Sequence, residues 1–236
     1  MKKMFIILSI VLLSVLLTGC KSIDYNEVYL NDEIQFTSVY SQQEMHEIIK
    51  EAMTLYTEAQ MVEIYSSYKK DKTSQKSITK YDLGKQKLIY ESTFEAFNDS
   101  LEKKIYVYDS YMYEYNNNNG DITKQKFKLF LNDVQFERIV VPYIPYMSYE
   151  FIFQDHIQSY GSYKCGNDQY NNTVLIFEPD KELPAMALYC KVLVIKDGLP
   201  LFYVYYHYGI EYVCEFKYKS ISLKMPKLEG YEQVNE

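Results

Sequence analysis

The chain has 236 residues, of which 47% are hydrophobic and 24% are charged, and its formal net charge is −7. This composition is typical of a globular protein with a sizeable core and argues against intrinsic disorder. The acidic balance, without a basic cluster, excludes nucleic acid as an expected partner. The 27 tyrosines favour a β-rich fold, because aromatic side chains suit pleated, half-buried surfaces.

The N-terminus has the order of a secretory signal. Lys2 and Lys3 precede an apolar run from Met4 to Leu17, which at 14 residues is short for a membrane-spanning helix of about 20. The stretch Leu17–Cys20 resembles the lipobox of bacterial lipoproteins, in which a diacylglycerol is attached to the cysteine and the chain is cut before it. The resemblance implies a signal peptide over residues 1–19, lipidation of Cys20 with acyl chains such as palmitate, and an extracytoplasmic protein anchored to the cell membrane.

Removal of the signal changes the charge balance. Subtracting Lys2 and Lys3 from the 25 basic residues leaves 23 against 32 acidic residues, a net charge of −9 on 217 residues. Such a charge disfavours electrostatic adhesion to anionic lipid head groups. We therefore expect the acyl chains on Cys20 to hold the protein at the membrane, for which two chains suffice.

The segment after the lipobox begins as a tether and continues as a helix. Residues 20–40 are polar and acidic, with at most an edge strand near residues 34–36. Ser41 and Glu44 then have the spacing of a capping box, which predicts a helix over residues 41–60. Its apolar stripe is either core packing against a sheet or the lid of a lipid cavity. The stripe consists of Met45, Ile48, Ile49, Ala52, Met53 and Tyr56.

The rest of the chain alternates with a period of two between turn sequences, which predicts an antiparallel meander. Strands are expected at residues 62–68, 77–82, 87–94, 104–115 and 123–131, and later at 157–164, 173–177, 188–195, 201–207, 211–219 and 221–225. Between the two groups, Asn132 and Gln135 predict a capped short helix over residues 132–141. Residues 147–156 have no assignable pattern. We expect a single domain over residues 41–230 and a tail at residues 231–236.

Three cysteines remain once Cys20 is taken by lipid. A register estimate for the last strands places Cys190 and Cys214 on opposite faces of the sheet, so they should not bridge unless a bulge shifts the register. A disulfide between Cys165 and Cys190 is the remaining pair. Three buried, unpaired thiols are an equally open alternative.

No short catalytic or metal-binding motif occurs in the chain. The histidines are His46, His156 and His207. A hydrolase would need His156 or His207 beside a cysteine or a carboxylate. We therefore expect no enzymatic activity, no metal site and no cofactor.

The order of elements resembles that of the LolA/LolB and LppX/LprG-like lipoprotein superfamily. The segments that carry the likeness are residues 104–109, 111–115, 196–202, 214–218 and 221–226. The resemblance implies an α+β fold whose predominantly antiparallel β meander forms a half-open barrel. It also implies that the N-terminal amphipathic helix and the short central helix pack on the concave face, and that the protein binds acyl chains or lipoproteins.

We therefore predict a non-catalytic, membrane-anchored lipoprotein that binds a lipid or acyl chain in a cavity between helix and sheet. The alternative is a structural or interaction lipoprotein of the cell envelope with a filled core, which contacts a protein partner through a Tyr-rich surface or an exposed strand edge. The first hypothesis requires an apolar cavity, and the second requires an exposed aromatic patch. The residues expected to line the cavity are Met45, Ile48, Ile49, Met53, Tyr56, Tyr111, Tyr113, Tyr212 and Phe216.

Overall fold

The computed structural model describes residues 25–30, 34–145, 147–218 and 221–234. The chain divides into two compact units, residues 1–34 and 35–236. The described part of the first unit contains a short helix, α2 (Tyr25–Tyr29). The predicted signal and Cys20 lie outside the described residues. Within the described ranges, no helix has the length and apolar character needed to cross a membrane.

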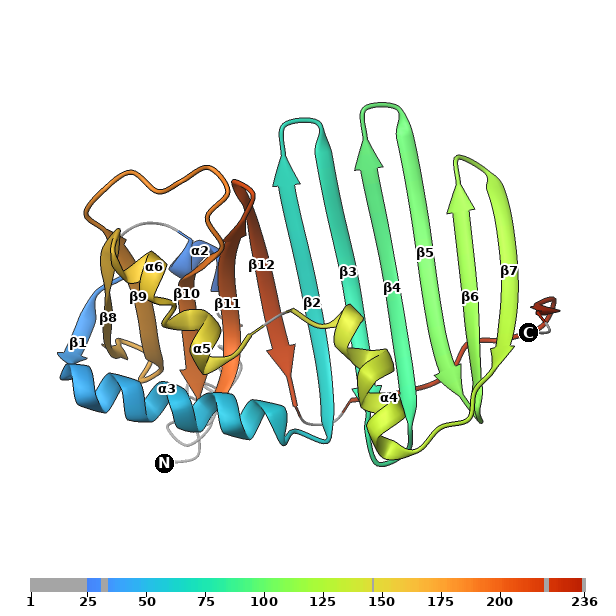
Figure 1. The fold of residues 1–236 in the computed structure, drawn as a ribbon, viewed down its shortest axis with the longest axis horizontal. Coiled ribbons are helices and arrows are strands. Elements are labelled where there is room, and N and C mark those ends of the chain that lie inside the picture. The colour runs from blue at the N-terminus through green and yellow to red at the C-terminus, as the bar shows by residue number, and fades with distance from the viewer. Residues whose placement is uncertain (1–24, 31–33, 146, 219–220, 235–236) are drawn as a thin grey trace, which may run out of the picture. The chain divides into compact units, whose positions relative to one another are not determined.

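The second unit is built on one sheet of thirteen strands (Figure 1), and its class is α+β, as expected. The order across the sheet is β1-β8-β9-β10-β11-β12-β2-β3-β4-β5-β6-β7-β13. All neighbours are antiparallel except β13, which runs parallel to β7. The described edge strands β1 and β13 do not pair with each other, so the sheet is open. The strands are β1 (Phe36–Val39), β2 (Met61–Lys70), β3 (Thr73–Asp82), β4 (Lys87–Ala96), β5 (Asp99–Tyr108), β6 (Tyr111–Asn118), β7 (Asp121–Lys128), β8 (Gly161–Asp168), β9 (Thr173–Pro179), β10 (Tyr189–Lys196), β11 (Leu199–His207), β12 (Ile210–Lys217) and β13 (Glu232–Gln233).

The pairing of β12 with β2 joins two meanders into this sheet. Phe216 lies opposite Ile64, and Cys214 lies opposite Ser66. The strands β2–β7 span residues 61–128, and β8–β12 span residues 161–217. A side chain on β12 therefore becomes the neighbour of one about 150 residues away, as in the contact of Cys214 with Ser66, which are 148 residues apart.

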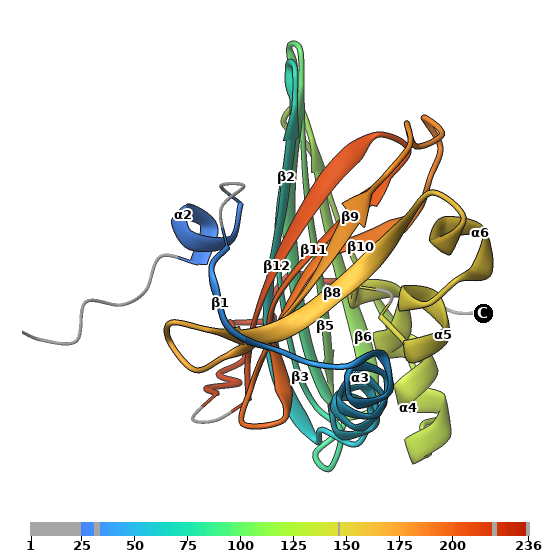
Figure 2. The ribbon, with the colours of Figure 1, turned by 90° about the vertical axis from the view of Figure 1, so that its left-hand side faces the viewer.

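The helices of this unit lie on one face of the sheet (Figures 1 and 2), which we call the helix-covered face; the other is the outer face. They are α3 (Gln42–Thr57), α4 (Asp133–Val140), the 3-10 helix η1 (Val141–Tyr143), α5 (Tyr149–Ile152) and α6 (Asp155–Gln158). Both predicted capping boxes are confirmed. In α3 the Ser41 hydroxyl accepts from the Glu44 amide at 3.3 Å, and in α4 the Asn132 side chain accepts from the Gln135 amide at 2.9 Å.

The apolar stripe of α3 is core. Met45, Ile49, Ala52, Met53 and Tyr56 are buried and belong to the same cluster as the apolar residues of the sheet. The helix contacts β11 most closely among the strands. Each fully buried aliphatic side chain contributes about 1.5–3 kcal/mol of favourable transfer free energy. The stripe therefore holds α3 onto the sheet along its length.

One expected strand, residues 104–115, is in fact two. Asp109 and Ser110 have φ values of 52° and 63° and form a two-residue turn between β5 and β6. Positive φ at both central positions is the geometry that matches the twist of a hairpin. Neither residue is glycine, so the turn has no strong sequence signal, and the prediction was wrong at this point.

Two further strand predictions are wrong in part. Residues 155–158 form α6, and the strand expected at 157–164 is shifted to Gly161–Asp168, where Tyr163 and Cys165 are buried. Residues 221–225 form no strand, because both sides of β12 are already paired with β11 and β2. This segment crosses the outer face instead (Figures 1 and 2).

The expected tether and tail both contribute to the sheet. Phe36–Val39 pairs with β8, and Gly166 of β8 allows this approach, because an added Cβ would lie 2.0 Å from the Ser38 carbonyl oxygen. At the other end, Glu232–Gln233 pairs with β7, and the Tyr231 ring packs at 5.4 Å against that of Tyr113. The folded region therefore extends beyond residues 41–230 at both ends.

The cysteines Cys165, Cys190 and Cys214 are free and buried. The Cys165–Cys190 bridge does not form, because β9 lies between their strands. The register estimate was also wrong. Cys190 and Cys214 pair with Tyr205 and Tyr203, which share a face of β11, because a bulge after Cys190 shifts the register.

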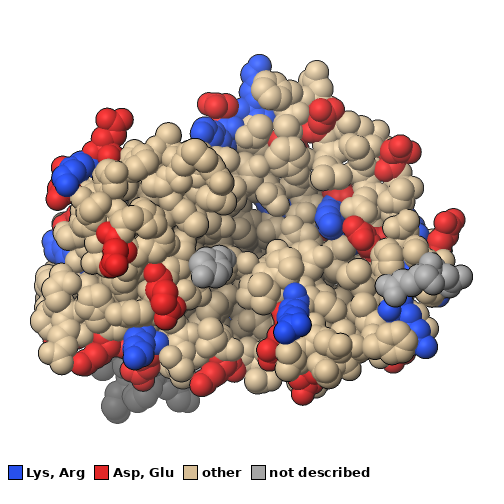
Figure 3. All heavy atoms as spheres, viewed as in Figure 1, with Lys and Arg blue, Asp and Glu red and all other residues tan. Residues whose placement is uncertain are grey.

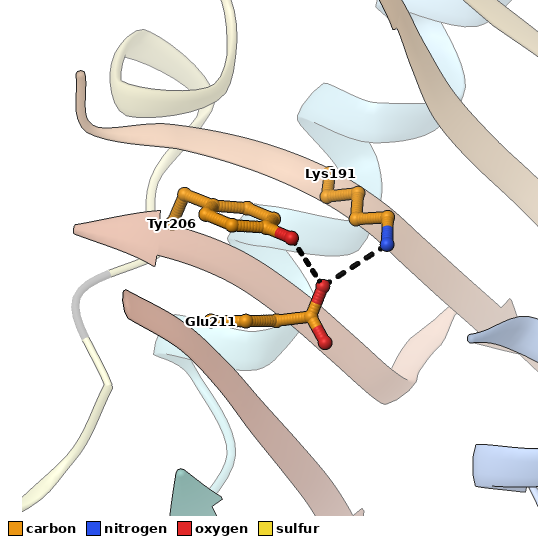
Figure 4. Close-up of polar contacts among 3 residues, drawn as sticks. All are labelled: Lys191, Tyr206 and Glu211. Carbon is orange, nitrogen blue, oxygen red and sulfur yellow. Dashed lines mark hydrogen bonds and ion pairs between the residues drawn. The ribbon is translucent and has the colours of Figure 1, made fainter. Parts of the chain in front are cut away.

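A polar cluster ties three strands together (Figure 4). The Glu211 carboxylate on β12 accepts a hydrogen bond from the Tyr206 hydroxyl on β11 at 2.7 Å and pairs with the Lys191 ammonium on β10 at 3.0 Å. The Lys191 and Glu211 side chains are 26% and 30% exposed. Partial burial strengthens such a pair relative to one in open solvent.

Candidate binding pockets

Two pockets open on the helix-covered face and share Ile144 and Pro145 as lining residues. Figure 3 shows that this face is hollowed near its centre. The larger, which we call the apolar pocket, has a volume of about 330 Å³. It is lined by Tyr56, Thr57, Tyr81, Leu83, Glu137, Val140, Val141, Ile144, Pro145 and Met147. Small-molecule sites begin at roughly this size, about 300 Å³.

Four elements position the walls of the apolar pocket. Tyr56 comes from the last turn of α3, and Tyr81 comes from the end of β3. Val140 ends α4, and Val141 begins η1, in which Pro142 stops the α-helix because proline lacks a donor. The pocket therefore lies beyond the end of α3, where the helix no longer covers the sheet.

The polar groups around the apolar pocket carry little charge. Burial raises the pKa of Tyr81 to about 12 and raises the pKa of Tyr56 well above its ordinary value. Both phenols are therefore protonated at neutral pH. Glu137 is the one charged residue among the described lining residues. Such a pocket suits an apolar ligand better than an ionic one.

The smaller pocket, which we call the hydroxyl pocket, has a volume of about 140 Å³. Ser66, Ser77 and Thr79 on β2 and β3 lie on the helix-covered face in register with Ile64. The Thr79 hydroxyl donates to the Tyr143 carbonyl and so holds the loop at Pro142–Pro145 over β3. The lining consists of Ile64, Ser66, Ser67, Tyr68, Gln75, Ser77, Thr79, Tyr90, Pro142, Tyr143, Ile144, Pro145, Tyr205 and Tyr212.

The structure separates the residues that the sequence predicted to line one cavity. Tyr56 lines the apolar pocket, and Tyr212 lines the hydroxyl pocket. Phe216 is in the core, where its ring packs at 5.6 Å against that of Tyr56. Three others, Met45, Ile49 and Met53, are core residues, and Ile48 packs against the core from its edge. None of these four is among the lining residues of the two pockets.

The prediction was wrong for Tyr111 and Tyr113. Their partners on β5 are Tyr108 and Tyr106, whereas Met112 lies opposite the core residue Val107. Successive side chains on a strand point to opposite faces. Tyr111 and Tyr113 are therefore on the outer face, away from both pockets.

Sequence reasoning missed the residues of the loop and of α4 that complete the pockets. Val140, Val141, Ile144 and Met147 line the apolar pocket, and their positions depend on where Pro142 and Pro145 direct the chain. Two prolines three residues apart, bounded by apolar residues, were the available signal. They mark the end of a helix, but not the face of the sheet over which the loop lies.

The histidines lie apart from the cysteines. His46 on α3 contacts the Tyr149 hydroxyl through Nδ1 at 2.9 Å. His156 and His207 have no hydrogen bond or ion pair to a cysteine or carboxylate within the described part of the chain. Burial raises the pKa of the Cys165 and Cys214 thiols to about 12, so both are protonated at neutral pH. Among the described residues, no group of three or more His, Cys, Asp or Glu side chains could hold a metal ion.

No model of a protein family matches this sequence, and no curated protein matches it either.

Proposed function

We propose that the protein is a non-catalytic, extracytoplasmic lipoprotein that binds a hydrophobic ligand, a lipid or an acyl chain, in the apolar pocket. The observation that carries the proposal is the pocket of about 330 Å³ between the end of α3, β3 and α4. Its walls are formed largely by aliphatic and aromatic side chains, which favour burial of apolar surface by about 25 cal/mol per Å².

Two features outside the pocket support this proposal. The lipobox-like Leu17–Cys20 would place the domain at a membrane surface, where lipid ligands are abundant. The sheet is open and carries its helices on one face, as in the half-open barrel of a LolA-like fold. In this proposal, the ligand occupies the part of that face that α3 leaves uncovered.

The test is photolabelling of the full-length, membrane-anchored protein with a fatty acid that bears a diazirine on its chain. We expect cross-links to map to residues 137–147 and 81–83. Val141→Trp should reduce this labelling about tenfold, because Val141 is 59% exposed at the rim and the larger ring would fill the pocket. Val134→Trp is the matched control, since Val134 on α4 is 58% exposed but does not line the pocket.

Labelling that is equal in the two tryptophan variants would contradict the proposal. Cross-links confined to the outer face would favour the second candidate function, a contact with an envelope protein. One observation supports that candidate: Tyr108, Tyr111 and Tyr115 lie beside lysines on the outer face, with Lys87 at 4.8 Å from the Tyr108 ring and Lys126 at 5.7 Å from that of Tyr111.

A further inference from the structure

The hydroxyl pocket differs in chemistry from the apolar pocket beside it. Among its described lining residues there is no Asp, Glu, Lys, Arg or His. Its polar groups are the hydroxyls of serine, threonine and tyrosine and the amide of Gln75. Its recognition chemistry is therefore that of neutral hydrogen bonds and aromatic faces.

Most of these polar groups are available to a ligand. Within the described chain, the side chains of Gln75 and Ser77 and the hydroxyls of Tyr205 and Tyr212 make no hydrogen bond to another residue. These groups are also not enclosed in the core. The tyrosine hydroxyls that are both buried and without a partner are those of Tyr56, Tyr203 and Tyr218, and neither Tyr205 nor Tyr212 is among them. A half-buried polar group that faces a pocket gains most from a ligand that can pair with it.

Aromatic rings stand on both sides of β3. On one side, the rings of Tyr205 and Tyr212 are stacked, with centroids 4.9 Å apart and an interplanar angle of 7°. On the other side, Tyr90 of β4 packs at 4.7 Å against Tyr143 of the loop. The strand order β11-β12-β2-β3-β4 places Ser77 of β3 between the two aromatic pairs.

The size of the pocket fits one six-membered ring. Its volume is about 140 Å³. A cavity of about 150 Å³ accommodates a benzene ring. A saturated ring with neutral hydroxyls at its edge matches this lining. Its C–H groups can lie against the tyrosine rings, and its hydroxyls can pair with the serine, threonine and glutamine side chains.

We infer that the hydroxyl pocket binds an uncharged pyranose ring. The ring is either a free glycoside or the head group of a lipid whose chain lies in the apolar pocket, which shares the lining residues Ile144 and Pro145 with the hydroxyl pocket. The first form is independent of the proposed function, and the second rests on it. In both, Gln75 and Ser77 bond the hydroxyls of the ring, and Tyr205 and Tyr212 contact its C–H face.

The test uses the full-length protein in a zwitterionic detergent and methyl β-D-glucopyranoside and methyl β-D-galactopyranoside as probes, followed by saturation-transfer NMR. We expect saturable binding of at least one glycoside. The variant Gln75→Ala/Ser77→Ala should weaken it about tenfold, and Tyr212→Phe should weaken it less. Ser74→Ala is the matched control, because Ser74 is on the same strand but contacts Glu95 on the outer face, and it should leave the affinity unchanged.

Two further probes make the outcome decisive. Cyclohexylmethanol has the ring without the hydroxyl pattern, and glucuronic acid adds a charge, so both should bind at least tenfold more weakly. Equal binding of cyclohexylmethanol, no saturable binding of either glycoside, or no effect of the double variant would overturn the inference.

Hexyl β-D-glucopyranoside separates the two sources of the ring. If it binds more tightly than the methyl glycoside and Val141→Trp abolishes the difference, the ring is a lipid head group. If its affinity equals that of the methyl glycoside, the ring is a free sugar. The photolabelling with fatty acid tests the proposed function separately, and its result does not depend on any of these outcomes.

Discussion

Two buried tyrosines differ in how their hydroxyls are satisfied. Tyr56 is 4% exposed, and its hydroxyl has no hydrogen-bond partner among the described residues. Tyr163 is 5% exposed, and its hydroxyl donates to the Cys190 carbonyl at 3.2 Å. A buried donor without a partner costs about 1–3 kcal/mol, whereas a formed bond contributes about 1 kcal/mol net.

This contrast predicts opposite effects for the same substitution. Tyr56→Phe should raise the free energy of unfolding by about 1 kcal/mol, because it removes an unpaired polar atom and keeps the ring. Tyr163→Phe should lower it by about 1 kcal/mol, because the Cys190 carbonyl loses its donor. Urea unfolding of the two variants measures both changes. A loss of stability in Tyr56→Phe as large as that in Tyr163→Phe would show that the Tyr56 hydroxyl has a partner.

At the scale of single residues, the sequence predicts burial better than it predicts pocket lining. The spacing of Met45, Ile49 and Met53 correctly indicated one apolar face of a helix. It could not tell whether that face lies on packed side chains or over a void, since both need the same residue types. Tyr111 was misplaced because one undetected turn at Asp109 left the face of the following strand undetermined.

Elements were predictable where they carry their own signals. The capping boxes at Ser41 and Asn132 located α3 and α4, since a side chain that accepts from the third amide is a local interaction. The turns at Asn119-Gly120 and Asp197-Gly198 are dipeptides typical of hairpins, and both residues of each have a positive φ. The strand expected at 221–225 has the alternation of a strand, but it cannot form a hairpin with β12, because both sides of β12 are paired with β11 and β2. Local sequence does not reveal that pairing.

The cluster of Lys191, Tyr206 and Glu211 should stabilise the pairing of β10, β11 and β12. Glu211→Gln should lower the free energy of unfolding by about 1 kcal/mol, because it removes a charge-assisted bond and a partly buried ion pair. Glu178→Gln should change it by less than about 0.5 kcal/mol, because its contact with Lys164 is 3.8 Å long and both side chains are exposed. Denaturant titration of the two variants compares them, and equal effects would mean that the cluster contributes no more than a surface pair.

The pockets are a property of the whole sheet. The hydroxyl pocket takes Ser66 from β2 and Tyr212 from β12, which are neighbours only because the last strand of one meander pairs with the first strand of the other. The alternation of β2 and of β12 was readable in each segment, but the pairing of segments about 150 residues apart depends on the global topology. The α+β class was therefore predictable, and the location of the pockets was not.

The buried thiols predict how the stability of the whole domain depends on pH. Burial raises the pKa of Cys165 and Cys214 to about 12, above the value of about 8.5 for an exposed thiol. Below about pH 8.5 each thiol is protonated in both the folded and the unfolded chain, so the stability that its buried neutral form contributes is fully present. Between pH 8.5 and 12 only the unfolded chain releases the proton, so stability is lost by up to about 1.4 kcal/mol per pH unit for each thiol.

Urea unfolding under reducing conditions from pH 7 to 10.5 measures this loss. The double variant Cys165→Ala/Cys214→Ala should be less stable at pH 7, because two small cavities form. It should also lose stability less steeply above pH 8.5. Parallel curves for the two proteins would show that the thiols are not protonated selectively in the folded state.

Native mass spectrometry of the full-length protein, released from its own membranes, tests the central proposal most directly. If the apolar pocket binds a lipid or acyl chain, the chain should carry one additional apolar molecule that solvent extraction removes, and Val141→Trp should lose it while Val134→Trp keeps it. A chain that carries no such molecule in either variant, and that takes up none when incubated with fatty acid, would contradict the account.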